Sequence, residues 1–180
     1  MKIKIPYKPR EHQKNVHKNL KRFNVLVCHR RFGKTVLCIN ELLKRALQNP
    51  MPRPRYYYIA PTYSMAKRTA FDYLKEYTKN IPDTTFHETE LRCDLPNGAR
   101  IQLLGCERPN SLRGLAMDGV VLDEVAQMPP RLWSEVVRPA LVDRYELGLQ
   151  YKFLSGTMIA IGTPQGLNAL FDLYDQAVHN

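Results

Sequence analysis

The sequence predicts an α/β fold, in which helices cover both faces of a mainly parallel sheet and a β-hairpin is added. Short apolar runs alternate with amphipathic segments of helical period along the chain, which is typical of strands joined by crossover helices. Two of these runs, Val25-Leu26-Val27 and Val120-Val121-Leu122, are followed by conspicuous polar sequences, Gly-Lys-Thr and Asp-Glu. The chain has 180 residues, which is enough for one well-packed domain and short for two.

The N-terminal part is expected to begin as an extended arm. Residues 1–9 contain Pro6 and Pro9, which oppose a helix. Residues 10–22 are predicted to be helical, because apolar residues recur there at a spacing that forms one face: Val16, Leu20 and Phe23. The next strand is predicted at Asn24–Val27, and the helix after it is expected to run to about Leu47 and to be largely buried, since it is apolar on several sides.

The segment Cys28-His29-Arg30-Arg31-Phe32-Gly33-Lys34-Thr35 has the form of a phosphate-binding P-loop with one irregularity. The usual pattern is G-x-x-x-x-G-K-[ST], and Cys28 stands at the first glycine position. A strand before the loop and a helix after it direct backbone N–H groups and the helix dipole toward a phosphate. Lys34 is expected to contact the β- and γ-phosphates of a nucleotide, and the Thr35 hydroxyl to bind Mg²⁺.

The segment Gly119-Val120-Val121-Leu122-Asp123-Glu124 has the form of a Walker B strand. An acidic residue at the end of such a strand holds Mg²⁺ directly or through water, and an adjacent carboxylate can orient the attacking water. We therefore expect Asp123 to support the metal ion and Glu124 to act on the water.

The middle of the chain is predicted to contain one strand, one helix and a hairpin. A strand is expected at Tyr56–Ala60 and is followed by a helix from about Met65 to Tyr77, which Pro61-Thr62-Tyr63-Ser64 precedes as a cap. Residues Glu90–Leu95 and Arg100–Leu104 alternate in polarity on either side of Pro96-Asn97-Gly98, which predicts a β-hairpin.

The C-terminal third is predicted to contain a helix at Pro129–Val142 that Pro139 could bend, a strand at Thr157–Ile161 and a last helix at Leu167–Val178. Residues 143–156 show no clear pattern. The strand Tyr56–Ala60 lies between the strand before the P-loop and the Walker B strand, and a glutamate directly follows the Walker B aspartate. Together these features favour the RecA-like (ASCE) branch of P-loop NTPases.

The charge and composition of the chain indicate which partners and which cellular compartment to expect. The formal net charge is +10, and the first 22 residues carry many Lys and Arg residues against one acid, Glu11; a basic protein of this size often meets a polyanion. No apolar stretch approaches the roughly 20 residues that span a membrane, and the N-terminus lacks the apolar core of a signal peptide. The four cysteines form no C-x-x-C pair, which favours reduced thiols, and Cys38 is expected in the core.

These motifs together resemble the ATPase domain of large terminase subunits from tailed bacteriophages, the motors that package DNA. The first P-loop glycine is often replaced in that family. Five segments carry the resemblance, in order between residues 9 and 164: Pro9-Arg10-Glu11-His12-Gln13, Arg30-Arg31-Phe32-Gly33-Lys34-Thr35, Ile59-Ala60-Pro61-Thr62, Ser111-Leu112-Arg113-Gly114 before the Walker B strand, and Ile161-Gly162-Thr163-Pro164.

The resemblance implies further roles for individual residues. Gln13 would hydrogen-bond the adenine edge of ATP, and Gly162, Thr163 and Pro164 would form a coupling motif that links phosphate release to movement. Arg113 would be an arginine finger that completes the site of a neighbouring subunit, and Arg30 or Arg31 is the competing candidate as a γ-phosphate sensor within its own subunit. The full set expected to bind the nucleotide is Gln13, Arg31, Phe32, Gly33, Lys34 and Thr35.

The resemblance also implies domain limits. We expect residues 1–180 to be a single P-loop ATPase domain, with residues 1–23 as an arm and adenine-side helix and 24–180 as the RecA-like core. Large terminases carry a second, nuclease domain, and no acidic triad for DNA cleavage can be placed in this sequence. A domain with ATP hydrolase activity and without nuclease activity is therefore expected, in a chain that is a fragment of the family's full length.

The expected cofactors are ATP and Mg²⁺, and the expected partners are those of a packaging motor. They are the phosphate backbone of double-stranded DNA, a homo-oligomeric ring that would be a pentamer on the portal, the portal protein and the small terminase subunit, with no membrane, in the host-cell cytoplasm. Two alternatives stay open: a helicase-like or repair DNA-dependent ATPase, and a non-catalytic module that binds a nucleotide or DNA through a degenerate P-loop.

Overall fold

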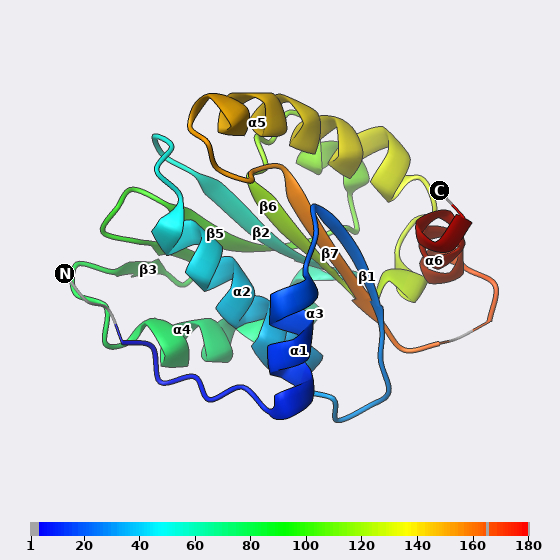
Figure 1. Ribbon diagram of the computed structural model, residues 1–180, viewed down its shortest axis with the longest axis horizontal. Coiled ribbons are helices and arrows are strands. Elements are labelled where there is room, and N and C mark those ends of the chain that lie inside the picture. The colour runs from blue at the N-terminus through cyan, green and yellow to red at the C-terminus, as the bar shows by residue number, and fades with distance from the viewer. Residues whose placement is uncertain (1–3, 165, 180) are drawn as a thin grey trace.

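The computed structural model describes residues 4–164 and 166–179, so the first three residues of the predicted arm and the last residue of the predicted core lie outside it. Its centre is a seven-stranded sheet with strand order β1-β7-β6-β2-β5-β4-β3 (Figure 1). Five neighbouring strands run parallel: β1 (Phe23–Val27), β7 (Thr157–Gly162), β6 (Gly119–Asp123), β2 (Arg55–Ala60) and β5 (Arg100–Gly105). Two short strands continue the sheet antiparallel: β4 (Arg92–Asp94) and β3 (Thr85–His87).

Helices cover both faces of this sheet, as the sequence predicts (Figure 1). One face packs against α1 (Glu11–Asn19), α2 (Lys34–Gln48), α3 (Tyr63–Ala66), the π-helical turn η1 (Lys67–Phe71) and α4 (Asp72–Thr78). The other face packs against short 3₁₀ turns η2 (Pro109–Leu112) and η3 (Val125–Gln127), the π-helical turn η4 (Trp133–Val137), α5 (Arg138–Gln150) and α6 (Ala169–His179). No described helix combines the length and the apolar character needed to cross a lipid bilayer.

The buried strands supply side chains to two separate cores. Successive strand residues point to opposite faces, so Tyr56 and Tyr58 of β2 enter the core under α2, whereas Tyr57 and Ile59 enter the core under α5. All four are at most 5% exposed, so the tyrosines of this strand serve in packing. Cys38 is fully buried, as expected.

The order of the strands in the sheet differs from their order along the chain. In the sheet, β7 lies between β1 and β6, whereas β2 lies on the far side of β6. From β1 the chain passes through α2 to β2, forms β3, β4 and β5 beyond it, and then returns to form β6. The last strand, β7, pairs between β6 and β1, which the order of the strands in the sequence does not reveal. Val27 is in register with Gly162, and Asp123 with Ile161, so the carboxyl ends of three parallel strands meet at one edge.

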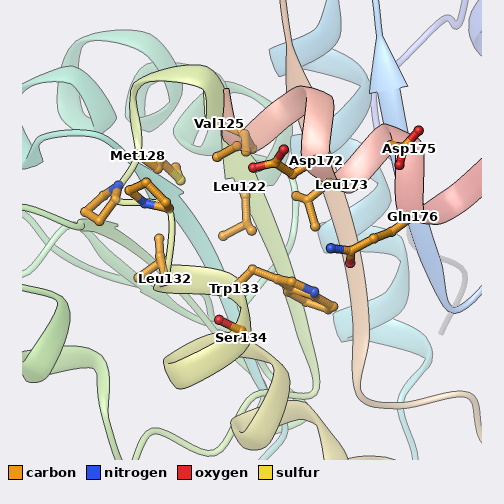
Figure 2. Close-up of a pocket in the computed structure, with 13 residues that line it drawn as sticks. Leu122, Val125, Met128, Leu132, Trp133, Ser134, Asp172, Leu173, Asp175 and Gln176 are labelled. Carbon is orange, nitrogen blue, oxygen red and sulfur yellow. The ribbon is translucent and has the colours of Figure 1, made fainter. Parts of the chain in front are cut away.

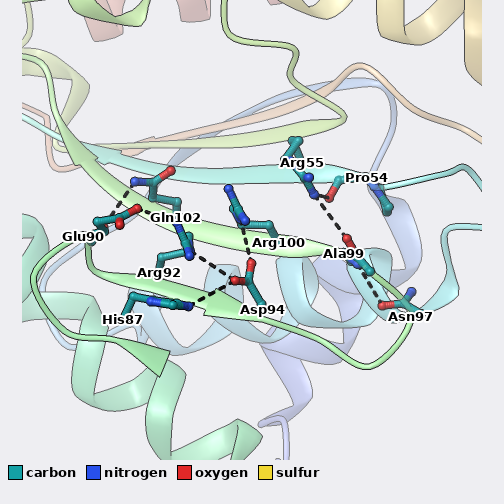
Figure 3. Close-up of polar contacts among 11 residues, drawn as sticks. Pro54, Arg55, His87, Glu90, Arg92, Asp94, Asn97, Ala99, Arg100 and Gln102 are labelled. Carbon is teal, nitrogen blue, oxygen red and sulfur yellow. Dashed lines mark hydrogen bonds and ion pairs between the residues drawn. The ribbon is translucent and has the colours of Figure 1, made fainter. Parts of the chain in front are cut away.

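The predicted hairpin is confirmed, and a third strand extends it. β4 and β5 pair antiparallel (Figure 3). The turn between them is closed by the Gly98 N–H, which donates to the Leu95 carbonyl at 2.9 Å. The additional strand β3 is only three residues long, which is too short to leave a clear alternating pattern in the sequence. One face of this extension is apolar and faces the core, whereas the other carries polar and charged side chains.

Two predicted helices are interrupted by wider turns. The helix expected at Met65–Tyr77 runs from α3 through η1 into α4, and the Thr62 side chain caps its start by accepting from Met65 N at 3.1 Å. The helix expected at Pro129–Val142 consists of η4 and α5, and it extends to Gln150, into the stretch without a clear pattern. Pro139 cannot donate a backbone hydrogen bond, and the π-helical turn directly before it accommodates that loss.

Candidate functional site

A cavity of about 460 Å³ lies at the edge where the parallel strands end. It brings together the P-loop, both Walker B carboxylates and the end of β7, which are far apart in the sequence. Its lining residues are Arg30, Arg31, Phe32, Gly33, Lys34, Thr35, Val36, Met65, Thr69, Tyr73, Asp123, Glu124, Gln127 and Thr163.

The P-loop turns sharply from β1 into α2. Arg31 and Gly33 both have left-handed backbone, with φ of 64° and 84°, and Gly33 is the residue directly before the first turn of α2. In residues 4–164 and 166–179, no side-chain cap is formed at that helix start, so its first backbone N–H groups can face an anion. This is the arrangement that the sequence predicts for binding a phosphate chain.

Cys28, at the irregular position, forms part of the loop's hydrogen bonding. Its N–H donates to the Gly162 carbonyl at 3.2 Å, and its own carbonyl accepts from Lys34 Nζ at 3.3 Å. The side chain is half-buried. Burial raises the pKa of the Cys28 thiol, although the nearby Lys34 charge opposes that shift. A cysteine is therefore accommodated here without disrupting the loop.

Lys34 joins the P-loop to the end of β7. Its ammonium group donates to the Thr163 hydroxyl at 3.2 Å and to the His29 carbonyl at 3.5 Å, besides the contact with Cys28. Lys34 is predicted to contact the phosphates, and Thr163 is predicted to couple phosphate release to movement. The structure places these two side chains in direct contact.

Asp123 lies at the bottom of the cavity and is 6% exposed. The Tyr58 hydroxyl donates to its Oδ2 at 2.5 Å. Burial raises the pKa of Asp123; the Tyr58 hydrogen bond and the Lys34 charge lower it, and the Glu124 charge raises it further. Burial and the charge of Asp123 hold the pKa of Tyr58 well above its usual value, so the phenol keeps its proton and remains a donor.

The residues around Asp123 fit a magnesium ion. Thr35 and Asp123 line the same cavity and supply the hydroxyl and carboxylate oxygens that Mg²⁺ prefers, a donor set that nucleotide phosphates and water complete. In the described part of the chain, no group of three His, Cys, Asp or Glu side chains forms a metal cluster of its own.

Glu124 enters the cavity from a strained backbone position. Its φ is 52°, a conformation that costs about 1–3 kcal/mol for a residue other than glycine and is often found at functional sites. The strained turn lets the consecutive residues Asp123 and Glu124 line the same cavity, whereas consecutive residues of a regular strand would point apart.

Gln13 lies beside the P-loop but does not line the cavity. It is 3% exposed, its Nε2 donates to the Gly33 carbonyl at 3.2 Å, and its Oε1 accepts from Arg10 N at 2.9 Å. Phe32 does line the cavity, with its ring centroid 4.5 Å from that of His12. The adenine-reading role of Gln13 stays a prediction of the resemblance.

The arginines predicted for catalysis occupy two different places. Arg30 and Arg31 line this cavity. Arg113 lies outside it, in the loop between η2 and β6, where its side chain contacts Asn110 at 3.1 Å and Glu135 at 3.4 Å. Arg113 is 54% exposed, and a surface position of this kind suits a residue that acts on a neighbour.

The remaining members of the coupling motif lie next to the cavity. Gly162 packs closely against α6, because a Cβ atom at this position would lie 2.8 Å from Leu170 Cδ2. Pro164 lines a neighbouring groove formed with α6 and Val27. The motif therefore contacts Lys34 on one side through Thr163 and α6 on the other.

Several cavity residues do not belong to any motif in the sequence. Met65, Thr69 and Tyr73 come from α3, η1 and α4, and Gln127 from η3. The only signal for the first three is the Pro61-Thr62 segment, which starts the helix that carries them. Tyr58, which binds Asp123, is indistinguishable in the sequence from the other tyrosines of its strand.

A second cavity, of about 270 Å³, is lined by Leu122 and Val125 and lies between η4 and α6 (Figure 2). Leu122, Leu132 and Trp133 give it apolar walls, and Asp172 and Asp175 of α6 lie at its side. It contains none of the predicted phosphate- or metal-binding residues. The larger cavity is therefore the candidate site.

Comparison with known proteins identifies a matching protein family. The family model described as "Terminase large subunit, T4likevirus-type, N-terminal" matches residues 27–178. The large terminase subunit of Thermus virus P23-45 is 27% identical over 195 aligned residues, which cover 94% of this chain and 36% of that protein. The chain thus spans 36% of the length of the curated relatives that it matches.

Solved structures show the same fold. The ATPase domain of the large terminase from Thermus phage P74-26 matches with a TM-score of 0.70 and 25% identity, over 93% of this chain and 70% of that chain. A large terminase from a thermophilic bacteriophage, solved in complex with ADP, matches with a TM-score of 0.55 and 15% identity, over 78% of this chain and 32% of that chain; this second likeness concerns the fold alone. The predicted RecA-like α/β fold is confirmed.

Proposed function

The chain belongs to the family of large terminase subunits, of which it matches the N-terminal part, and on that premise we propose that it is the ATPase domain of a viral DNA-packaging motor. It would couple ATP hydrolysis to translocation of double-stranded DNA into a procapsid. The observation that carries the proposal is the convergence of Lys34, Asp123, Glu124 and Thr163 on one cavity.

The proposed reaction is in-line attack of water on the γ-phosphate of ATP. Lys34 and the N–H groups at the start of α2 would bind the phosphate chain and offset its charge, and Glu124 would orient the attacking water. Thr35 and Asp123 would hold Mg²⁺, which supplies further charge stabilisation when it is bound. The buried Tyr58 hydroxyl would keep the Asp123 carboxylate in one orientation.

The contact between Lys34 and Thr163 suggests how hydrolysis is coupled to movement. An anionic phosphate would compete with the neutral Thr163 hydroxyl for the Lys34 ammonium group, because charge-assisted hydrogen bonds are roughly twice as strong as neutral ones. Binding and release of the γ-phosphate would therefore loosen and restore the link at 3.2 Å. Movement of Gly162-Thr163-Pro164 would then pass to α6, against which Gly162 packs.

An arginine is proposed to complete the transition-state charge balance. Arg113 would reach the cavity of a neighbouring subunit in a ring, whereas Arg30 or Arg31 would sense the γ-phosphate in its own subunit. Such a residue can contribute about 10³–10⁵ to the rate in related hydrolases.

The proposed partners follow from the family. They are DNA phosphates, contacted without regard to sequence and hence in a salt-dependent manner, a homo-oligomeric ring, proposed to be a pentamer on the portal, the portal protein and the small terminase subunit. Assembly would take place in the host-cell cytoplasm. The net charge of +10 supports contact with a polyanion.

The test is ATP hydrolysis and DNA packaging by the full-length protein with procapsids and linear DNA. Lys34→Ala and Glu124→Gln should each lower kcat by at least about 100-fold and abolish packaging, whereas the exposed controls Lys79→Ala and Glu146→Gln should not. Packaging that survives either of the first two changes would refute the mechanism. Strand separation without packaging would favour a helicase-like ATPase, and DNA binding without nucleotide binding would favour a non-catalytic module.

A further inference from the structure

The start of α1 lies against the outer side of the P-loop and donates to it repeatedly. Arg10 Nη1, His12 Nε2 and Gln13 Nε2 lie 3.4, 3.2 and 3.2 Å from three successive carbonyl oxygens, in chain order, in residues 31–33. A carbonyl can only accept, so His12 Nε2 must carry a proton in this contact. These three contacts hold the carbonyl edge of residues 31–33.

Gln13 is the most tightly fixed of the three donors. It is 3% exposed, and both ends of its side-chain amide are hydrogen-bonded to backbone, at Arg10 N and the Gly33 carbonyl. A Cβ atom at position 33 would lie 2.7 Å from Gln13 Nε2. The glycine therefore serves both the left-handed turn and the close approach of this amide.

The far end of α1 is anchored to α2 independently. His17 Nδ1 lies 2.7 Å from Glu41 Oε2, and the Tyr7 hydroxyl lies 3.0 Å from His17 Nε2. Glu41 is 2% exposed and also accepts from Arg45 Nε at 2.8 Å. Because Glu41 belongs to the helix that the P-loop begins, α1 is fixed to α2 both at its phosphate end and further along.

A P-loop of this shape needs such support. Two of its residues have left-handed backbone, and Arg31 lacks the freedom of a glycine. Carbonyl groups held on the outer edge leave the N–H groups of the same peptides directed to the inner side, where the phosphate chain is proposed to lie.

We propose that Arg10, His12 and Gln13 are positioning residues, which hold the carbonyl edge of the P-loop so that its N–H edge is preset for phosphates. This inference rests on the proposed nucleotide binding. It differs from adenine reading by Gln13 in what these residues control. A positioning role predicts that they set the affinity for the phosphate chain, whereas adenine reading predicts that Gln13 sets the preference for one base over another.

Calorimetric titration of the full-length protein with Mg²⁺ and three ligands tests the inference: ADP, GDP and inorganic tripolyphosphate, which has no base. Gln13→Glu keeps the acceptor for Arg10 N and removes the donor to Gly33. This variant should lower the binding affinity for all three ligands in parallel, by about five- to tenfold. His12→Ala should act in the same direction, and His12→Gln, which restores a donor, should recover most of the affinity.

The matched control is Lys14→Ala, on the same helix. Among the described residues, the Lys14 side chain pairs with its helix neighbour Glu11 at 3.0 Å, so this variant should bind like the wild type. Loss of ADP affinity with unchanged tripolyphosphate affinity would overturn the inference in favour of adenine reading, as would a failure of His12→Gln to recover binding. If Gln13→Glu does not fold, the two His12 variants decide. Absence of binding by the wild type would instead refute the proposed function on which the inference rests.

Discussion

The two ends of strand β6 carry aspartates in opposite electrostatic situations. Asp118, directly before the strand, is 1% exposed and surrounded by donors. Arg144 approaches it with two nitrogens at 3.0 Å each, Ser155 donates at 2.6 Å, and the Arg55 N–H donates at 2.6 Å. Its charge and its lone pairs are satisfied within the chain.

At the other end, Asp123 is almost equally buried but has no comparable balance. Its side chain accepts from the neutral Tyr58 hydroxyl, its neighbour Glu124 adds a like charge, and burial raises its pKa. The nearby Lys34 lowers that pKa without reversing the shift.

The difference distinguishes a structural carboxylate from a functional one. At Asp118, the surrounding donors offset the cost of burying a charge, and removal of that charge would leave a buried guanidinium without its partner. At Asp123, part of that cost stays uncompensated within the chain, which is consistent with the proposed role of this carboxylate in holding Mg²⁺. Three substitutions test this comparison.

The largest effect on stability is expected for Asp118→Asn. Removal of the charge leaves the mostly buried Arg144 guanidinium without its counter-charge, which should lower the free energy of unfolding by about 3 kcal/mol. Urea denaturation measures this change, and Asp143→Asn, on the exposed side of the same helix as Arg144, is the control. A loss below about 1 kcal/mol would show that Asp118 is not the structural carboxylate described here.

Asp123→Asn should have a smaller effect, and of the opposite sign. The amide can still accept from Tyr58, and it removes an unfavourably buried charge, so the free energy of unfolding at neutral pH should stay equal or rise by about 1 kcal/mol, while Mg²⁺-dependent ATP hydrolysis is lost. Because the folded-state pKa lies above the ordinary 3.8, wild-type stability relative to the variant should fall as pH rises from below 3.8 through the folded-state pKa. Denaturation at several pH values without nucleotide would expose a contrary trend.

The smallest effect is expected for Asp94→Asn, on the open face of the hairpin extension (Figure 3). Burial alone would raise the pKa of Asp94, but the Arg100 hydrogen bond at 2.6 Å and the charges of Arg100, Arg92 and His87 lower it. The group is partly exposed, so the loss should be at most about 0.5 kcal/mol.

The pH dependence of that loss has a definite sign. Since the folded-state pKa of Asp94 is depressed below 3.8, its contribution is present above pH 3.8 and disappears as pH falls through the folded-state value. Wild type and variant should therefore converge in acid and in high salt. A difference that persists in 1 M salt would indicate a role beyond charge pairing.

The motifs could be predicted because their geometry is local. Gly33, Lys34 and Thr35 follow a strand and open a helix, so sequence neighbours alone define the phosphate-binding turn. The hairpin around Asn97 was predictable for the same reason.

What sequence patterns missed depends on distant partners. Tyr58 and Asp123 are 65 positions apart, and their contact exists only because β2 and β6 pair in register. The insertion of β7 between β1 and β6, which brings Thr163 to Lys34, is likewise a property of strand order. The hydrogen bonds from α1 to the P-loop were not predicted, because Gln13 matched a motif in which this residue contacts adenine.

The half-buried Cys28 gives the protein a built-in reporter. The other three cysteines are at most 1% exposed, so a thiol reagent added to the folded chain meets Cys28 first. Burial raises the pKa of this thiol, which makes its reaction slow at neutral pH. Since burial depends on the conformation of the loop, the reaction rate should change when the loop opens or closes. A fluorophore attached at this position would signal from the phosphate-binding loop itself without an introduced cysteine.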